Sequence, residues 1–189
     1  MPYELIVIGV SMGGLAALST ILPQLPKEFS IPILVVQHMS SDANNFLAEH
    51  LSSLCILPVL NVEDKFIIKK NTIYIAPGGY HLLVEDKNTL ALSLDPKVNY
   101  SRPSIDVLFE SAAEVFKEKL IGVVLSGANS DGVNGAKKIK SLGGFMIVQS
   151  VKTAEATMMP AETIKAVKVD KILDLDDIGP FLTSMESKK

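Results

Sequence analysis

The chain has 189 residues, of which 48% are hydrophobic and 21% charged, and its 18 basic and 21 acidic residues give a formal charge of −3. This composition is typical of a globular domain with a full hydrophobic core, and it excludes a disordered chain and a broad cationic surface for nucleic acid. The single cysteine, Cys55, excludes an internal disulfide, and the three histidines lack the Cys/His spacing of a zinc site.

The N-terminal residues do not resemble a targeting signal. Residues 1–4 contain no basic segment, and the apolar run that follows leads into glycines instead of a small-residue cleavage site. No uninterrupted apolar run reaches the ~20 residues that a membrane helix needs. We therefore expect a cytoplasmic protein that is not embedded in a membrane.

The first predicted strand leads directly into a serine. The apolar residues 5–8 predict a buried strand, a glycine-rich turn follows at 9–14, and a helix is predicted at about 14–22. Ser11 has a glycine two residues before it and another two residues after it, as in a strand-to-helix turn that exposes the serine oxygen. This position is typical of a nucleophile, and the backbone N–H of Met12 is then the expected oxyanion donor.

Two other uses of this turn remain open at this point. Ser11 could simply cap the predicted helix, because serine is a common N-cap residue. The glycines could also hold a phosphate at the helix N-terminus, although the turn lacks both the G-x-G-x-x-G pattern and a Walker lysine. The G-x-S-x-G string alone is short enough to occur by chance, so its partners decide between these readings.

The remaining elements predict an α/β fold. Further strands are predicted at 33–36, 73–75, 121–125 and 145–148, and further helices at about 42–53, 104–118, 132–142 and 160–167. Several strands are apolar throughout, as in a parallel sheet that is buried on both faces. We therefore expect a doubly wound, mostly parallel sheet with helices on both faces.

Two segments depart from this alternation. Residues 80–94 predict an antiparallel β-hairpin near one edge of the sheet. The last residues, 186–189, are polar, and we expect a frayed tail there after a single domain at 1–185.

His38 is the best candidate for a general base. It follows the predicted strand 33–36, and the carboxyl ends of parallel strands share one edge of the sheet, so His38 and Ser11 can meet there. The alternative is a histidine that merely hydrogen-bonds to the backbone. His50 lies within a predicted helix and is expected to face solvent, and His81 opens the hairpin, where it could line a cleft.

Asp131 is the best candidate for the carboxylate that orients the base. It lies between the strand predicted at 121–125 and the helix predicted at 132–142, again at the carboxyl edge of the sheet. Capping of the helix that follows explains an aspartate at this position equally well. Asp106, by contrast, fits the first turn of its own helix.

Four segments together resemble the catalytic domain of the protein-glutamate methylesterase of bacterial chemotaxis. In this family the serine, histidine and aspartate form the catalytic triad, so the resemblance implies that Ser11, His38 and Asp131 are catalytic and moves Asp131 towards that role. It also implies no metal or organic cofactor, and it covers nearly the whole chain. The segments are IGVSMGG (8–14), VVQHM (35–39), SRPSIDVLF (101–109) and LSGANSDG (125–132).

The resemblance implies hydrolysis of glutamate methyl esters on the cytoplasmic helices of chemotaxis receptors, with release of methanol, and deamidation of receptor glutamines as a second activity. The chain departs from the family at Met12, where a small hydroxylic residue is usual, and at 128–130, where Met-Gly-Asn is usual. A catalytically silent receptor-binding module is therefore the alternative. Family members commonly carry an N-terminal receiver domain, whereas the first motif starts at residue 9 here, which leaves room for a separate regulatory partner.

Overall fold

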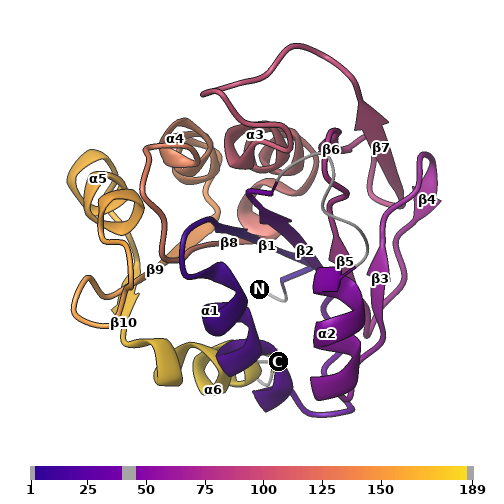
Figure 1. Cartoon of the computed structure of the whole chain (residues 1–189), viewed down its shortest axis with the longest axis horizontal. Coiled ribbons are helices and arrows are strands. Elements are labelled where there is room, and N and C mark those ends of the chain that lie inside the picture. Colours follow the sequence, from indigo (N-terminus) through magenta and orange to yellow (C-terminus); the bar gives the residue numbers. More distant parts are fainter. Residues whose placement is uncertain (1–2, 40–45, 187–189) are drawn as a thin grey trace.

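A seven-stranded parallel sheet forms the centre of the computed structural model, which describes residues 3–39 and 46–186. The strand order is β10-β9-β8-β1-β2-β5-β3, and every neighbouring pair is parallel (Figure 1). The strands are β1 (Leu5–Val10), β2 (Ile33–Gln37), β3 (Val59–Asn61), β5 (Ile73–Ile75), β8 (Leu120–Val124), β9 (Phe145–Gln149) and β10 (Lys171–Leu173). The predicted doubly wound α/β fold is confirmed.

Helices cover both faces of this sheet (Figure 1). One face carries α1 (Gly14–Ile21), α2 (Phe46–Leu54) and α6 (Leu175–Glu186), and the other carries α3 (Ile105–Phe116), α4 (Val133–Ser141) and α5 (Met158–Ala166). Two 3₁₀ turns, Leu22–Gln24 and Lys117–Lys119, follow α1 and α3. Alternate residues of β1 enter the two cores, so the strand has to be apolar throughout.

The predicted hairpin is confirmed, but it belongs to a second, smaller sheet. The strands β6 (His81–Val84) and β7 (Thr89–Ser93) pair antiparallel, and β4 (Phe66–Ile67) adds to β7 on its other side. The inner residues of β6 and β7 are buried in the same core as α3. This sheet therefore covers one face beside α3.

Several elements were absent from the sequence-based expectation. The strands β3, β4 and β10 are too short for a periodic signal, and the helix α6 contains Pro180, which is unfavourable inside a helix. The predicted helix at 42–53 is α2, and its residues 42–45 lie outside the described residues. Of the expected frayed tail, Glu186 is the last residue of α6, and its carboxylate accepts a hydrogen bond of 2.6 Å from the Ser30 N–H; residues 187–189 lie outside the described part.

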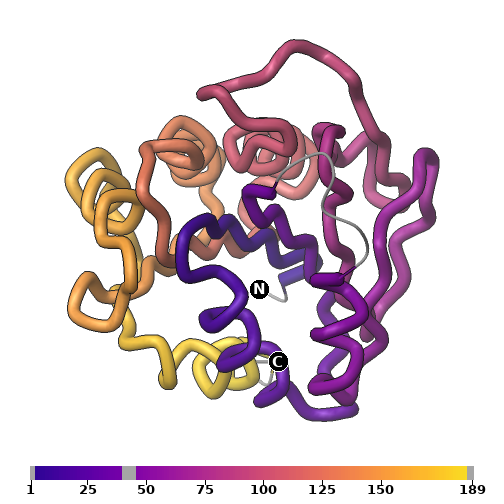
Figure 2. Tube along the Cα trace, in the orientation of Figure 1, coloured from indigo at the N-terminus to yellow at the C-terminus, as the bar shows by residue number. Residues whose placement is uncertain are grey.

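The order of the strands reverses beside β1, so that the loops after β1, β2 and β8 leave the sheet at one edge. The trace in Figure 2 leaves the central strand β1 towards β2, β5 and β3, and later crosses back to β8, β9 and β10 on the other side. Such a reversal leaves room for a ligand between the loops of open α/β sheets. Among the described residues, no helix is both long and apolar enough to cross a membrane.

Candidate active site

Ser11 lies in a tight turn between β1 and α1. Its N–H donates to the carbonyl of Ser126 at 2.9 Å, and its own carbonyl accepts from the N–H of Gly14 at 3.0 Å. Gly13 has a φ of +79°, a conformation that favours glycine, and it is the N-cap of α1 without any side-chain cap. The helix-capping alternative for Ser11 is therefore not seen.

Gln37, the last residue of β2, supports this turn, and the sequence analysis missed it. Its Nε2 donates to the carbonyl of Ser11 at 2.8 Å. A Cβ atom at Gly14 would collide with the Gln37 amide, so a glycine is needed there for close packing and not for its φ. The sequence did contain a signal for this role, because Gln37 is a polar residue at the end of an otherwise apolar strand and directly precedes His38.

His38 and Asp131 are in direct contact. Val10 and Gln37 are partners in the β1–β2 register, so Ser11 and His38 each follow a paired strand end. His38 Nε2 lies 2.7 Å from Asp131 Oδ2, and the carboxylate is fully buried while the imidazole is 11% exposed. An ionised carboxylate only accepts hydrogen bonds, so Nε2 carries the proton and Nδ1 is the unprotonated nitrogen.

The side chain of Asn129 contacts Nδ1, the second nitrogen of the His38 imidazole. Its Nδ2 lies 3.3 Å from His38 Nδ1, and its Oδ1 accepts the N–H of Asp131 at 3.1 Å. The second bond fixes the amide so that the NH₂ group faces the imidazole. Among the described residues, no hydrogen bond joins Ser11 Oγ to His38.

The Asp131 carboxylate also lies at the N-terminus of α3. Burial would by itself raise its pKa, but hydrogen bonds from His38, the Ile105 N–H and Asn99 outweigh that effect, so the pKa is lowered and the group stays ionised. The free N–H groups and the dipole of α3 favour this charge. Its six donors are His38 Nε2 and Ile105 N to Oδ2, and Asn99 Nδ2, Ser104 Oγ, Asp106 N and Gly132 N to Oδ1.

Asp131 therefore caps a helix, but not the one that was predicted. The helix that follows it in the chain, α4, has Gly132 as its N-cap and no side-chain cap. The same carboxylate caps α3 and contacts His38. The two interpretations of Asp131, as a helix cap and as the partner of the histidine, are therefore not exclusive.

Asp106 mirrors this arrangement at α4. Its Oδ1 accepts the N–H of Gly135, in the first turn of α4, at 2.7 Å. Burial and the nearby charge of Asp131 raise the pKa of Asp106, although the bonds from Gly135 and Asn99 oppose this. Asn99 Nδ2 lies 3.0 Å from an oxygen of each carboxylate and so bridges the two. Asp106 thus caps its neighbour's helix and not its own, which the sequence could not show.

Ser126 connects the turn of the serine to a distant loop. Its Oγ donates to the Met12 carbonyl at 2.7 Å and accepts the Ala156 N–H at 2.8 Å. The Met12 N–H has no hydrogen-bond partner in the described parts of the chain, and the Met12 side chain is exposed. The Met12 N–H can therefore donate a hydrogen bond to a substrate, whereas the Ser11 N–H already donates to the Ser126 carbonyl. The role of the Met12 N–H as oxyanion donor stays a prediction.

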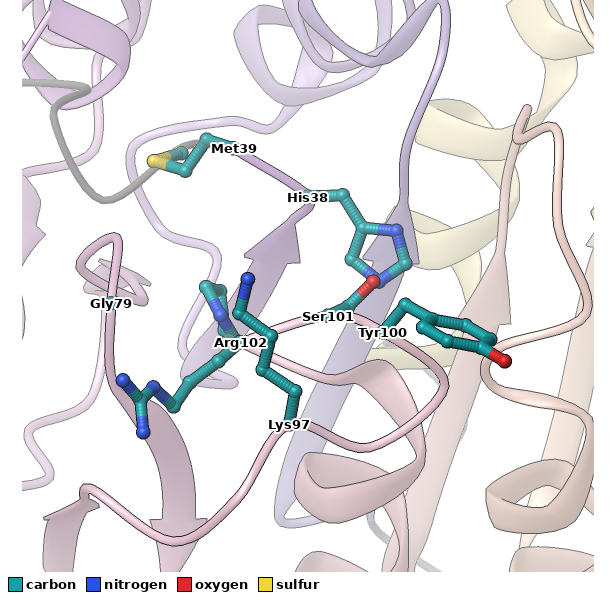
Figure 3. A pocket seen from close by; sticks show the side chains of 8 residues that line it. His38, Met39, Gly79, Lys97, Tyr100, Ser101 and Arg102 are labelled. Atoms are coloured by element: carbon teal, nitrogen blue, oxygen red, sulfur yellow. The ribbon is translucent and has the colours of Figure 1, made fainter.

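A pocket of about 490 Å³ opens beside His38 (Figure 3). Two cationic side chains line it, and no acidic residue does so among those that the structure describes. The lining residues are His38, Met39, Gly79, Lys97, Tyr100, Ser101, Arg102 and Pro103.

The other histidines have separate structural roles. His50 Nε2 lies 3.2 Å from Ser19 Oγ, on α2 and α1. His81 is buried, accepts the N–H of Ser104 at Nδ1 and lies 3.1 Å from the carbonyl of Pro96 at Nε2. Over 3–39 and 46–186, no group of three or more His, Cys, Asp or Glu side chains could hold a metal ion.

Both the sequence and the fold of this chain are similar to those of known methylesterases. The profile of the CheB methylesterase family matches residues 6–182. A protein of Leptospira interrogans is 48% identical over 98% of this chain and 96% of its own length. The protein-glutamate methylesterase/protein-glutamine glutaminase of Trichodesmium erythraeum is 38% identical over 95% of this chain, which spans 52% of that protein. The crystal structure of the Thermotoga maritima CheB methylesterase catalytic domain has a TM-score of 0.93 and 36% identity, over 98% of this chain and 100% of that chain.

Proposed function

Because the chain belongs to the CheB methylesterase family, it is a hydrolase of glutamate methyl esters and glutamine side chains, and we propose that Ser11, His38 and Asp131 carry out the reaction. The observation that carries this assignment is the 2.7 Å contact between His38 and a buried, ionised Asp131 beside the Ser11 turn. This contact leaves Nδ1 of the imidazole unprotonated, as a general base requires.

In the first half-reaction, Ser11 Oγ attacks the side-chain carbonyl of a methylated glutamate while His38 Nδ1 takes the serine proton. Asn129 must release Nδ1 for this transfer, because its Nδ2 occupies that nitrogen in the resting site. Asp131 keeps Nε2 protonated and stabilises the imidazolium that forms. The Met12 N–H donates to the oxyanion, a contact typically worth about 3 kcal/mol.

The imidazolium then returns its proton to the leaving group. Methanol departs, and the glutamyl group remains as an ester on Ser11. In the second half-reaction, a water molecule gives one proton to His38 while its oxygen attacks the carbonyl of this ester. His38 then returns the proton to Ser11 Oγ as the bond between Oγ and the acyl carbon breaks, which restores the serine hydroxyl and releases a glutamate side chain that ionises to the carboxylate. A glutamine side chain follows the same course with ammonia as the leaving group.

The family acts on chemotaxis receptors, and we assign the cytoplasmic helices of such receptors as the substrate and the cytoplasm as the place of action. The pocket beside His38 is open at the surface, which suits an ester on a folded protein. The alternative of a silent binding module is less well supported, because the serine, the base and its carboxylate are all present. Control by a separate partner remains a proposal that rests on the family's usual receiver domain.

Methanol release from methylated chemoreceptor membranes tests this function. The wild-type chain should release methanol, and Ser11→Ala should release none while keeping its melting temperature. Ser141→Ala is the matched control, because it removes an exposed hydroxyl that bonds only within α4. A serine-directed phosphonate should label the wild type and the control but not Ser11→Ala. Methanol release by Ser11→Ala at the wild-type rate would exclude Ser11 as the nucleophile.

A further inference from the structure

Among the residues that the structure describes, the pocket beside His38 is lined by positive charges and by no negative one. Lys97 and Arg102 line it from the segment between β7 and α3, and neither forms an ion pair with another described residue (Figure 3). The chain as a whole is acidic, with a formal charge of −3. A local cationic pocket on an acidic protein indicates a site that attracts a specific anion.

Arg102 is held in place with donor capacity left over. Its Nη1 donates to the carbonyls of Leu94 and Asp95 at 2.7 and 3.0 Å, which fixes the plane of the guanidinium. Its Nε is buried and has no partner within the described residues. A buried donor without a partner is uncommon in proteins, and a planar guanidinium suits a carboxylate particularly well.

The position of the pocket defines what this anion can be. His38 lines the pocket and also contacts Asp131, so the pocket and the catalytic centre share one side chain. Side chains one helical turn apart are about 5–6 Å from each other on a helix surface. An acidic side chain on the same face of a substrate helix as the reacting ester is therefore presented towards the pocket while the ester is at Ser11.

We propose that Lys97 and Arg102 form a carboxylate subsite that selects glutamate methyl esters with an unmodified acidic side chain about one helical turn away. This inference rests on the proposed function and adds a preference among its substrates. Tyr100, which is 97% exposed at the rim, lies where the same substrate surface would contact the enzyme. Esters in neutral surroundings are then poor substrates, and an unmodified glutamate promotes the demethylation of a methylated neighbour about one helical turn away.

The test compares two helical polypeptides with one glutamyl methyl ester each. In the first the ester is flanked one turn away by glutamates, and in the second by alanines; glutamines are unsuitable because deamidation would create the carboxylate. The wild type should prefer the first by about tenfold in kcat/KM at low salt, a ratio in the range of charge-assisted contacts. Added salt at 0.5 M should reduce this ratio because it screens exposed charges.

Lys97→Gln and Arg102→Lys should each lower the preference to about threefold or less. Lys168→Gln is the matched control: Lys168 is an exposed lysine outside the pocket, and its replacement should leave the ratio unchanged. Because both substrates meet the same enzyme sample, partial unfolding of a variant cancels in the ratio. Equal kcat/KM for the two substrates would overturn the subsite alone, whereas no methanol from either would overturn the proposed function and the subsite with it.

Discussion

Asp131→Asn replaces one carboxylate oxygen with an NH₂ group, and we expect it to lower activity and stability together. Whichever oxygen position the NH₂ group takes, it faces groups that donate to the carboxylate in the wild type. If it lies at the Oδ2 position, both His38 Nε2 and the Ile105 N–H lose their acceptor. The imidazole can then keep a bond only by moving its proton to Nδ1, where it can no longer act as a base.

The magnitudes follow from these contacts. The wrong tautomer should reduce kcat by about 10⁴-fold, as in other serine hydrolases that lose this charge. Loss of the negative charge at the N-terminus of α3 costs about 1–2 kcal/mol. An unpaired, buried Ile105 N–H adds about 1–3 kcal/mol. The free energy of unfolding should therefore fall by about 3 kcal/mol, equivalent to a melting temperature about 9 °C lower for a chain of this length.

Asp106→Asn provides the matched control, because Asp106 caps α4 in the same way but does not contact His38. This variant should lose about 1–2 kcal/mol of stability and retain kcat within about fivefold. Methanol release gives kcat, and urea unfolding followed by circular dichroism gives stability. If Asp131→Asn kept kcat within tenfold of the wild type, its catalytic role would be refuted; if it unfolded at the wild-type urea concentration, the capping argument would be refuted.

Three further predictions concern the same centre. Gly14→Ala should lower kcat more than about tenfold, because the new methyl group displaces the Gln37 amide that holds the Ser11 carbonyl; unchanged kinetics would show that this contact is dispensable. Ser126→Ala should cost about 1–2 kcal/mol in urea unfolding and reduce kcat, since it removes the hydrogen bond to the Met12 carbonyl in the serine turn and the one from the Ala156 N–H; equal urea midpoints would contradict this. The lowered pKa of Asp131 means that its stabilising charge is fully present above the unfolded-state pKa of about 4 and is lost as the pH falls through the lowered value. The difference in unfolding free energy between the wild type and Asp131→Asn should thus shrink as the pH falls below about 4, and a difference that is undiminished at about pH 2.5 would disprove the assignment.

The sequence predicted the centre of the fold better than its margins. The strands around Ser11 and His38 are apolar throughout, and this pattern follows from burial on both faces of the sheet. By contrast, β3, β4 and β10 have two or three residues each, too few for a period to be visible. The helix α6 was not predicted, although its buried residues Ile178, Leu182 and Met185 recur at helical spacing; packing of these side chains against the core offsets the unfavourable Pro180.

In the candidate site, too, the sequence suggested some residues and missed others. Ser11, His38 and Asp131 could be selected as candidates because each follows a strand, and the carboxyl ends of parallel strands meet at one edge. For Asp131 the position alone left helix capping equally open, and the family resemblance favoured the catalytic role. The supporting residues Gln37 and Asn99 were not identified, because their partners are backbone and carboxylate groups far away in the chain. Such contacts arise from tertiary structure, and a single sequence carries no local pattern for them.

The position of Asp131 between α3 and His38 has a consequence for how relatives of this chain can lose activity during evolution. The Ser11 hydroxyl makes no hydrogen bond within the described residues, so a lineage can replace it without weakening the fold. Replacement of Asp131 removes the acceptor of six hydrogen bonds and is penalised even when activity is no longer needed. If Ser11 is the nucleophile that we propose, inactive descendants should therefore retain the aspartate long after the serine has been replaced, and the serine should distinguish active relatives from inactive ones better than the aspartate does.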